Sequence, residues 1–504
     1  MKLIKKGKPS DIKIGILMPM PYNAAVNSLF FQTAYEYIND LEDVIAYRYV
    51  YNIKDDVLEA LDTEININNL DAILISMSFE LDYIYIARIL DKINLLHRYK
   101  GFKKPILIAG GIAVTANPLP LADIVDVVVI GEVDGILRDM IYVVGDDKPL
   151  KYLETFDCIS ISPFKYKAKR CFVKDLNRAL HAVKQFFPLD EEPVYGYGIR
   201  VEVSRGCPYL CAFCMEGHIQ YPFRYRDMEI VWKIIEKGLE SCISKRVIFY
   251  SLAFFSIPYI DKFLNKLIEY SIKASIPSLR VDQITKERLD IIKKLGQKTI
   301  TLAPETLLKG ISCSIGKCYE TDHLVNIIEE AFHQGFEHVK LYLITGFPKS
   351  NLMEELKEFK KLLAKLSWIK KPKFLRIALN PLIPKPWTPY QFIPPSSVLS
   401  LSHNINSYYK LAKESIFTSI ESFNYKWAFA QAVIAQGDER ISKLIIEWGR
   451  YGLGLKGFYK ALKSIDSKTI DFIYNGWKDP PWYKTIDMGL PQNYFKMRYD
   501  YLSS

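Results

Sequence analysis

Several features that mark familiar protein classes are scarce or missing in this sequence. There are only 8 cysteines in 504 residues, too few to suggest a secreted fold held together by disulfides. No uninterrupted apolar run reaches the length needed to cross a bilayer. The first residues, 1–8, carry positive charge, but no apolar segment follows them. We therefore expect a cytoplasmic protein in a reducing compartment.

The sequence also lacks a clustered stripe of Lys and Arg, which argues against nucleic acid as a partner. Lys and Arg number 67 against 57 Asp and Glu, a net charge of +10. This mild excess fits contact with an anionic membrane surface, but it fits a solvated surface equally well. With 49% apolar residues the chain has the composition of a soluble protein of two or three domains.

Residues 1–150 alternate apolar runs with helical patterns. The expected strands are 12–20, 46–51, 71–79, 105–109 and 125–130, and the expected helices are 28–40, 56–63, 81–96 and one from 134. Apolar strands separated by helices favour a parallel sheet covered on both faces, so we predict a doubly wound, Rossmann-like α/β domain. At its strand ends Gly110, Gly111 and Gly131 would let a bulky ligand approach, although each could simply turn the chain.

The rest of the chain divides into three parts. Residues 151–194 are predicted to be a linker, with Cys158 and Cys171 in structural roles. Six strand–helix repeats in residues 195–392 predict a partial (β/α)6 TIM barrel with its chemistry at the carboxyl ends of the strands. Residues 393–504 are predicted to form a helical, aromatic-rich domain.

Three cysteines gather at the first barrel strand. Cys207, Cys211 and Cys214 follow the spacing C-x3-C-x2-C, with Phe213 just before the last. Three thiolates on a four-iron cluster leave one iron without a protein ligand, and an open coordination site is typical of catalytic metal centres. Two alternatives are three buried thiols and a zinc site that uses His218 as a fourth ligand.

This cysteine motif resembles the cluster loop of the radical S-adenosylmethionine (SAM) enzymes. The likeness extends to Ala303-Pro-Glu305, to Ile344-x-Gly346-x-Pro348 and to the exit Asn380-Pro-x-x-Pro-Lys-Pro-x-Thr-Pro389. It implies that a reduced [4Fe-4S] cluster cleaves SAM to a 5′-deoxyadenosyl radical, which takes hydrogen from an unactivated carbon. The electron would come from an external donor of the ferredoxin or flavodoxin type.

The resemblance also implies SAM-binding residues at the strand ends. Arg280 is a cation suited to the carboxylate of SAM, and Glu305 is an acceptor suited to its ribose or ammonium group. Gly346 supplies a turn, and Phe213 lies beside the cluster. The family's Gly-Gly-Glu after the second strand is absent, and Ser251 stands there as its substitute. The alternative for Arg280 and Glu305 is an ordinary ion pair.

The first domain resembles the cobalamin-binding domain that precedes many radical SAM cores, on Gly110-Gly111 and Gly131-Glu132. The family's Asp-x-His-x-x-Gly is missing, and the domain's only histidine is His97, at the end of a predicted helix. Cobalamin would therefore bind without this lower ligand, or the domain has lost it. The first 150 residues hold no cysteine, which disfavours the methylthiotransferases, since these carry a second cluster there.

The combined resemblance implies an enzyme that forms carbon–carbon bonds or adds methyl groups. The domain order is similar to that of archaeal tetraether-lipid ring synthases, which would mean cyclopentane ring formation in an apolar lipid and a long apolar tunnel at the cluster. Another small molecule or an RNA as the methylated substrate is the alternative. A non-catalytic cobalamin or ligand sensor is a third hypothesis.

Overall fold

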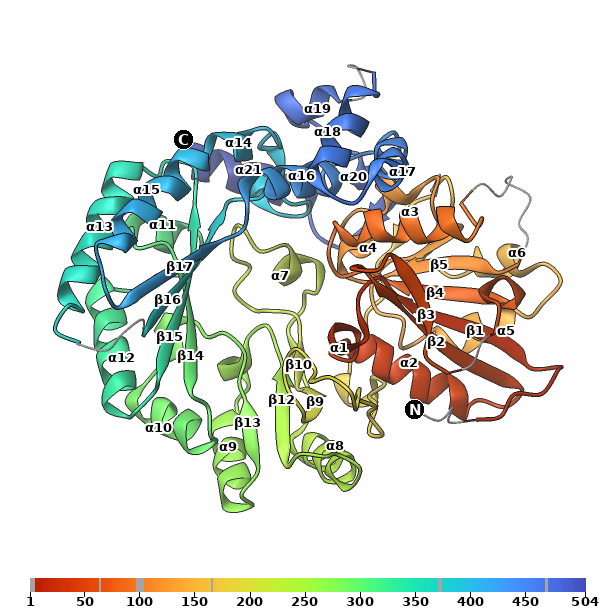
Figure 1. The fold of residues 1–504 in the computed structure, drawn as a ribbon, viewed down its shortest axis with the longest axis horizontal. Coiled ribbons are helices and arrows are strands. Elements are labelled where there is room, and N and C mark those ends of the chain that lie inside the picture. Colours follow the sequence, from red (N-terminus) through yellow and green to blue (C-terminus); the bar gives the residue numbers. More distant parts are fainter. Residues whose placement is uncertain (1–4, 63–64, 97–103, 165, 370–373, 467–469) are drawn as a thin grey trace.

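A computed structural model of the chain describes residues 5–62, 65–96, 104–164, 166–369, 374–466 and 470–504. Figure 1 shows an N-terminal α/β domain beside an open barrel, with C-terminal helices spanning the top of both. In these described ranges no helix is both long enough and apolar enough to cross a membrane. His97, the only histidine of the first domain, lies outside the described residues.

The N-terminal domain is built on a seven-stranded sheet of order β3-β2-β1-β4-β5-β6-β7. The strands are β1 (Ile12–Met18), β2 (Val44–Asn52), β3 (Val57–Ala60), β4 (Ala72–Ser76), β5 (Ile106–Gly110), β6 (Val127–Val129) and β7 (Ile159–Ile161). Five are parallel, and both edge strands run antiparallel to their neighbours. Its longer helices are α2 (Leu29–Asp40), α3 (Asp82–Lys92) and α5 (Leu137–Val143), and its shorter ones are α1 (Tyr22–Ala25), α4 (Ile112–Ala116) and α6 (Pro149–Leu153).

The predicted doubly wound architecture is confirmed, because α2 and α5 pack on one face of the sheet and α3 on the other. Two local predictions are wrong. The helix expected at 56–63 is instead β3, because Asp56 adopts a positive φ of 55° and turns the chain back along β2. The segment 151–194, expected to be a linker, contributes β7 to the sheet, and its Cys158 and Cys171 form a disulfide.

Gly131, just beyond β6, is expected to tolerate no side chain. Its φ is +101°, and an added Cβ would lie 2.1 Å from the carbonyl oxygen of Cys171. We expect Gly131→Ala to lower the free energy of unfolding by about 2 kcal/mol or more, as measured by urea denaturation. Gly135→Ala is the matched control, since nothing lies within 4 Å of its added Cβ. Equal stability of the two variants would contradict this account.

The barrel consists of seven parallel strands, one more than predicted. They are β9 (Ile199–Glu202), β12 (Arg246–Tyr250), β13 (Lys273–Ser275), β14 (Thr299–Glu305), β15 (His338–Thr345), β16 (Leu375–Pro381) and β17 (Thr418–Ser422). The covering helices are α8 (Met228–Glu240), α9 (Ile260–Glu269), α10 (Lys286–Lys294), α12 (Thr321–His333), α13 (Leu352–Lys365) and α15 (Ser402–Lys413). A bridge between Leu279 and Leu302 joins the two parts of the wall, and the opening faces the N-terminal domain (Figure 1).

Two barrel strands differ from the sequence prediction. The third strand lies at 273–275 rather than 278–281, since Pro277 has no N–H with which to continue the ladder. The extra strand, β17, lies in the segment predicted to be helical and pairs in parallel with β16. The barrel therefore has one strand more than predicted. The strand ends at which the sequence predicts the chemistry are unchanged.

The C-terminal helices tie the two other parts together. They are α16 (Tyr425–Ala435), α17 (Ile441–Tyr451), α18 (Leu455–Lys463), α19 (Asp471–Asn475), α20 (Trp482–Thr485) and α21 (Gln492–Ser503). Helix α17 packs against α3 of the N-terminal domain, and Asn117 donates hydrogen bonds to the carbonyl oxygens of Ala435 and Gly437. Trp448 and Trp482 are completely buried, so these two aromatic side chains form core rather than a surface groove.

Candidate active site

The cysteine loop lies where the barrel opens toward the N-terminal domain. Strands β9 and β10 (Ser204–Arg205) lead into it, and the short helix α7 (Met215–Ile219) follows it. Gly206 turns the chain at a φ of +75°, and an added Cβ there would lie 2.4 Å from the carbonyl oxygen of Pro222. Figure 1 shows α7 between the barrel wall and the N-terminal domain, so the loop faces both.

The three cysteines of the loop are free thiols. Cys211 is buried, and Cys207 and Cys214 are half-buried. Burial raises the pKa of all three thiols, so an iron cluster would have to displace their protons on binding. Polar groups already face two of the sulfurs: Arg280 Nη1 donates to Cys211 Sγ at 3.6 Å, and the N–H of Gly217 donates to Cys214 Sγ at 3.4 Å. This donor set suits a cluster bound by thiolates, because both contacts favour negative sulfur.

A single zinc ion does not fit this arrangement. Within the described ranges no three His, Cys, Asp or Glu side chains converge as the ligands of one ion would. His218, the predicted fourth ligand, points its Nδ1 at the carbonyl oxygen of Cys214, 2.8 Å away. Ligands of separate irons in a cluster need not converge on one point, so the arrangement is compatible with three corners of a cluster. Phe213 packs edge-on against Phe347 beside the loop.

Arg280 lies directly beside the cysteine loop. Its Nε and Nη2 each donate to the carboxylate of Asp282 at 3.0 Å, and its guanidinium lies 3.8 Å above the ring centre of Tyr209. The ion pair with Asp282 is thus present, as the alternative reading expects. Because Nη1 reaches Cys211, however, the same side chain places positive charge at the proposed metal site.

Glu305 is buried at the end of β14, and its partner was not foreseen from the sequence. Lys317 Nζ pairs with Glu305 Oε1 at 2.6 Å and also donates to the carbonyl oxygen of Ala303 at 2.9 Å. Lys317 lies in a loop without any recognisable motif, so only the fold brings it here. Glu305 adopts a positive φ of 65°, which aims its side chain across the strand end.

The two remaining predicted SAM contacts lie at other strand ends. Ser251 follows β12, and its Oγ hydrogen-bonds Ser204 Oγ at 2.7 Å. Gly346 follows β15 with a φ of +97°, and a Cβ added there would collide with Leu401 at 2.6 Å. Gly346 therefore has a packing reason to be glycine, and a role in binding SAM stays a prediction for both residues.

Two cavities share part of their lining, and residues that flank the cysteine loop line them: Ser204 before the loop lines one, and Glu216 after it lines the other. One, of about 780 Å³, fills the barrel interior and is lined by Ser251 and Ser278 among others. The second, of about 770 Å³, lies at the strand ends of the N-terminal domain, where Gly110, Gly111 and Gly131 line it. The residues that line both cavities include Leu29, Tyr195, Glu202, Gln220 and Tyr250.

A charged network of Glu132, Asp134, Glu202 and Arg205 lines the N-terminal cavity at the domain interface. Arg205 pairs with Glu132 at 3.0 Å, with Asp134 at 2.7 Å and with Glu202 at 2.8 Å. Desolvation raises the pKa of Glu202, but Arg205 and Arg226 more than offset this, and the net pKa is lowered. This network could not be predicted from the sequence, because its members come from both domains.

Two family models match the chain. One, described as radical SAM proteins, N-terminal, matches residues 31–155. The other, described as radical SAM superfamily, matches residues 201–363 and includes all three loop cysteines. Residues 201–363 are a radical SAM domain. The chain is accordingly an enzyme, and the family of this domain uses a [4Fe-4S] cluster and SAM.

This radical SAM protein is 29% identical over 438 residues to an uncharacterized protein of Methanocaldococcus jannaschii. The aligned residues cover 86% of this chain and 90% of that protein. Its fold is similar to that of the radical SAM methyltransferase TsrM from Kitasatospora setae, with a TM-score of 0.53, 11% identity and coverage of 77% and 78% of the two chains. It also resembles OxsB, a cobalamin-dependent SAM radical enzyme, with a TM-score of 0.52, 14% identity and coverage of 98% and 72%. At these identities the solved structures establish the shared fold.

Proposed function

We propose that this radical SAM enzyme holds its [4Fe-4S] cluster on Cys207, Cys211 and Cys214 and transfers a methyl group, or joins carbons, with the help of a corrinoid in the N-terminal cavity. The observation that carries the proposal is that the two cavities share part of their lining and that residues on either side of the cysteine loop, Ser204 and Glu216, line one cavity each. A cofactor at the N-terminal strand ends, a SAM molecule at the loop and a substrate in the barrel would then lie next to one another.

When bound, the reduced cluster supplies the electron that cleaves SAM, and a corrinoid supplies a methyl carrier. The chain's own contribution is orientation and charge. Arg280 beside Cys211 would hold the carboxylate of SAM, and Glu305, positioned by Lys317, would accept from its ammonium or hydroxyl groups. The protein around Arg280 and Glu305 would exclude water from the radical reaction.

The N-terminal cavity supports a large, partly apolar ligand. It extends from the glycine-lined strand ends to apolar side chains of four strands, Met18, Leu74, Ile108 and Val129. Its one described histidine, His181, is not available as a ligand: Nδ1 faces the Ala182 carbonyl at 2.9 Å, and Nε2 accepts from the N–H of Glu202 at 3.1 Å. The chain would therefore hold a corrinoid without a lower histidine.

The barrel cavity supports a polar small-molecule substrate better than a lipid chain. Its lining mixes polar side chains, among them Ser204, Ser275, Thr301 and Arg246, with apolar ones such as Ile248, Phe249 and Ile276. An isoprenoid tail would need a continuous apolar tunnel at the loop, as expected for lipid ring formation, and the charged and hydroxyl groups in this mixed lining count against it. An external electron donor of the ferredoxin or flavodoxin type, a cytoplasmic location and contact with a membrane surface remain predictions.

The test is anaerobic purification followed by reconstitution with iron and sulfide. We expect about four irons per chain, since three cysteines hold a four-iron cluster, and formation of 5′-deoxyadenosine or S-adenosylhomocysteine from SAM after reduction. Growth with added cobalamin should yield protein that carries corrinoid absorbance. Iron-free protein, or loaded protein that leaves SAM intact, would refute the proposal and favour a ligand sensor. Protein that binds iron and turns over SAM but carries no corrinoid would refute only the corrinoid part of the proposal.

Replacement of Glu305 by glutamine is expected to weaken SAM binding by about tenfold or more, because a charge-assisted hydrogen bond becomes a neutral one. The dissociation constant of SAM measured by equilibrium dialysis reports this directly. Glu320→Gln is the control: Glu320 pairs only with exposed Lys309 in this region, and its own side chain is 64% exposed. Similar constants for both variants would remove Glu305 from the SAM site.

A further inference from the structure

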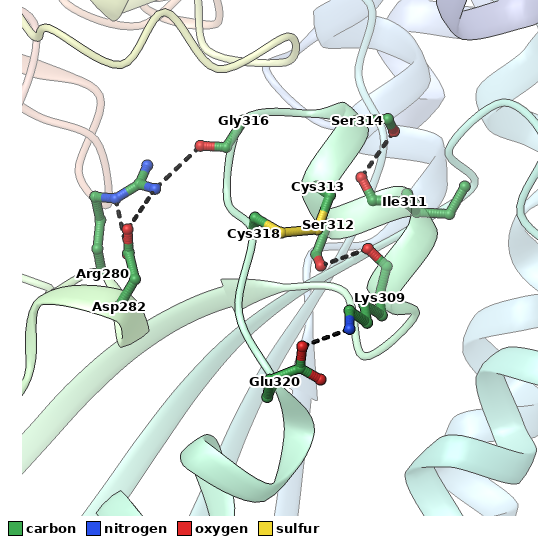
Figure 2. Close-up of a disulfide and its surroundings, with 10 residues drawn as sticks. All are labelled: Arg280, Asp282, Lys309, Ile311, Ser312, Cys313, Ser314, Gly316, Cys318 and Glu320. Atoms are coloured by element: carbon green, nitrogen blue, oxygen red, sulfur yellow. Dashed lines mark hydrogen bonds and ion pairs between the residues drawn. A yellow bond between two sulfur atoms is a disulfide. The ribbon is translucent and has the colours of Figure 1, made fainter.

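A second pair of cysteines lies next to the cysteine loop. Cys313, in helix α11 (Lys309–Ser314), forms a disulfide with Cys318 across a sequence separation of 5 residues. Figure 2 shows the small ring that this bond closes, with Gly316 at its tip directed toward Arg280. The proposed cluster ligands do not include either cysteine, so the pair is free for another role.

The backbone inside the ring is hydrogen-bonded to the cluster loop. The carbonyl oxygen of Ile315 accepts from the N–H of Ala212 at 3.0 Å. The carbonyl oxygen of Gly316 lies 3.8 Å from Cys211 Sγ and accepts from Arg280 Nη2 at 3.0 Å. A Cβ on Gly316 would lie only 3.6 Å from the Cα of Cys211. Two consecutive carbonyl groups of the ring thus define where the cluster loop lies.

The side chain of the next ring residue reaches the other half of the proposed SAM site. Lys317 Nζ pairs with Glu305 at 2.6 Å, and its backbone N–H donates to the carbonyl oxygen of Ser312 at 2.8 Å, which keeps the ring folded. Residues 315–317 therefore contact the cluster loop, Arg280 and Glu305 together. A change in the freedom of this ring would act on all three at once.

The two disulfides of the chain differ in their access to solvent. Cys318 is exposed and Cys313 is half-buried, so a small thiol or disulfide reagent can reach the bond. In the other disulfide Cys158 is completely buried and Cys171 is half-buried, so neither of its cysteines is exposed as Cys318 is. Thiol–disulfide exchange requires in-line access to one sulfur, which favours reaction at the Cys313–Cys318 bond.

We propose that Cys313 and Cys318 form a reversible thiol–disulfide site that clamps residues 314–317 onto the cluster loop when oxidised and loosens them when reduced. The proposal rests on the cluster assignment made above. The disulfide restricts the conformations open to the ring, so the carbonyl groups of Ile315 and Gly316 stay aligned with their donors at a lower entropic cost.

The exchange steps balance with a small disulfide as oxidant and a dithiol as reductant. In oxidation, the thiolate of Cys318 attacks the oxidant and releases one thiolate, and Cys313 then attacks the Cys318 sulfur and releases the second. The pair loses two electrons and two protons, which the small disulfide gains. In reduction, a dithiol thiolate attacks Cys318, the Cys313 sulfur leaves as a thiolate, and the second thiol of the reagent releases Cys318.

The test measures how fast cluster iron is lost to a ferrous chelator. Anaerobic, cluster-loaded enzyme is treated with oxidised glutathione or with dithiothreitol, and the reagent is removed by gel filtration. Alkylation and peptide mass spectrometry report the state of both cysteines. We expect iron release to be about fivefold slower from the oxidised protein, the effect of strengthening one hydrogen bond. The double variant C313S/C318S should release iron at the faster rate after either treatment.

The outcomes separate this proposal from the function proposed above. Equal release rates from oxidised and reduced wild-type protein that binds iron and cleaves SAM would overturn the clamp alone. Two free thiols at Cys313 and Cys318 after oxidation would also overturn it. Wild-type protein that binds no iron at all would refute the cluster assignment and the clamp with it. Cys242→Ser is the control, because this free cysteine lies outside the ring and the loop, and its variant should respond like the wild type.

Discussion

Substitution of Cys211 by serine is expected to abolish SAM cleavage and to lower the iron content of the anaerobically purified protein. Serine keeps the size of the side chain but replaces a soft thiolate by a hydroxyl group that binds iron poorly. Even outer contacts of metal ligands cost about 10- to 100-fold in affinity or activity when removed. Loss of a direct ligand should lower activity by more than that range. The measurement is the amount of 5′-deoxyadenosine formed per enzyme.

Cys242→Ser is the matched control for this substitution. Cys242 is also a free, partly buried thiol, but it lies after helix α8 and away from the loop. Its variant should keep the iron content and SAM turnover of the wild type. Wild-type turnover in C211S, or an equal loss in C242S, would contradict the assignment of the loop as the cluster site.

Arg205→Ala is expected to destabilise the folded protein by about 3–5 kcal/mol, the range for removing one partner of a buried ion pair. Glu132 and Glu202 would keep Arg224 and Arg226 as partners, at 2.7 and 3.2 Å, but Asp134 would lose its ion pair with Arg205. Urea denaturation of the iron-free protein at neutral pH measures the change without interference from cluster loss.

The pH dependence of this effect has a defined sign. The folded-state pKa of Glu202 is lowered, so its ion pairs stabilise the protein above its ordinary pKa and lose that contribution as the pH falls through the folded value. The difference in stability between Arg205→Ala and wild type should therefore narrow in acid. Arg178→Ala is the control, since the Arg178 side chain is 86% exposed beside Asp175, and we expect a change below about 0.5 kcal/mol. A similar small change in Arg205→Ala would contradict the role of the network.

The periodic parts of the fold could be predicted from the sequence. The strand Arg246–Tyr250 and the helix Met228–Glu240 lie where their apolar patterns place them. The pattern failed where tertiary pairing decides. The edge strand β3 pairs with β2 across a tight turn, and the edge strand β7 pairs with β6, which lies much earlier in the chain. Strand β17 forms because β16 provides a partner for its backbone hydrogen bonds.

The site divides in the same way. The cysteine spacing identifies Cys207, Cys211 and Cys214, because one short loop carries all three donors. Arg280 and Glu305 could be named from the ends of their strands. Lys317 could not, since its pairing with Glu305 depends on a loop that folds back over the barrel. The Arg205 network was equally hidden, because two domains supply its charges.

The hydrogen bonds from Asn117 to Ala435 and Gly437 have a consequence for how large ligands reach the interior. They brace the first domain against the C-terminal helices. Moving the two halves apart as rigid bodies would break this brace and also the hydrogen bond that Trp387 Nε1 donates to the carbonyl oxygen of Ala116. A bulky cofactor should therefore be taken up while the polypeptide folds or through local side-chain rearrangement, and exchange with free cofactor in solution should be slow.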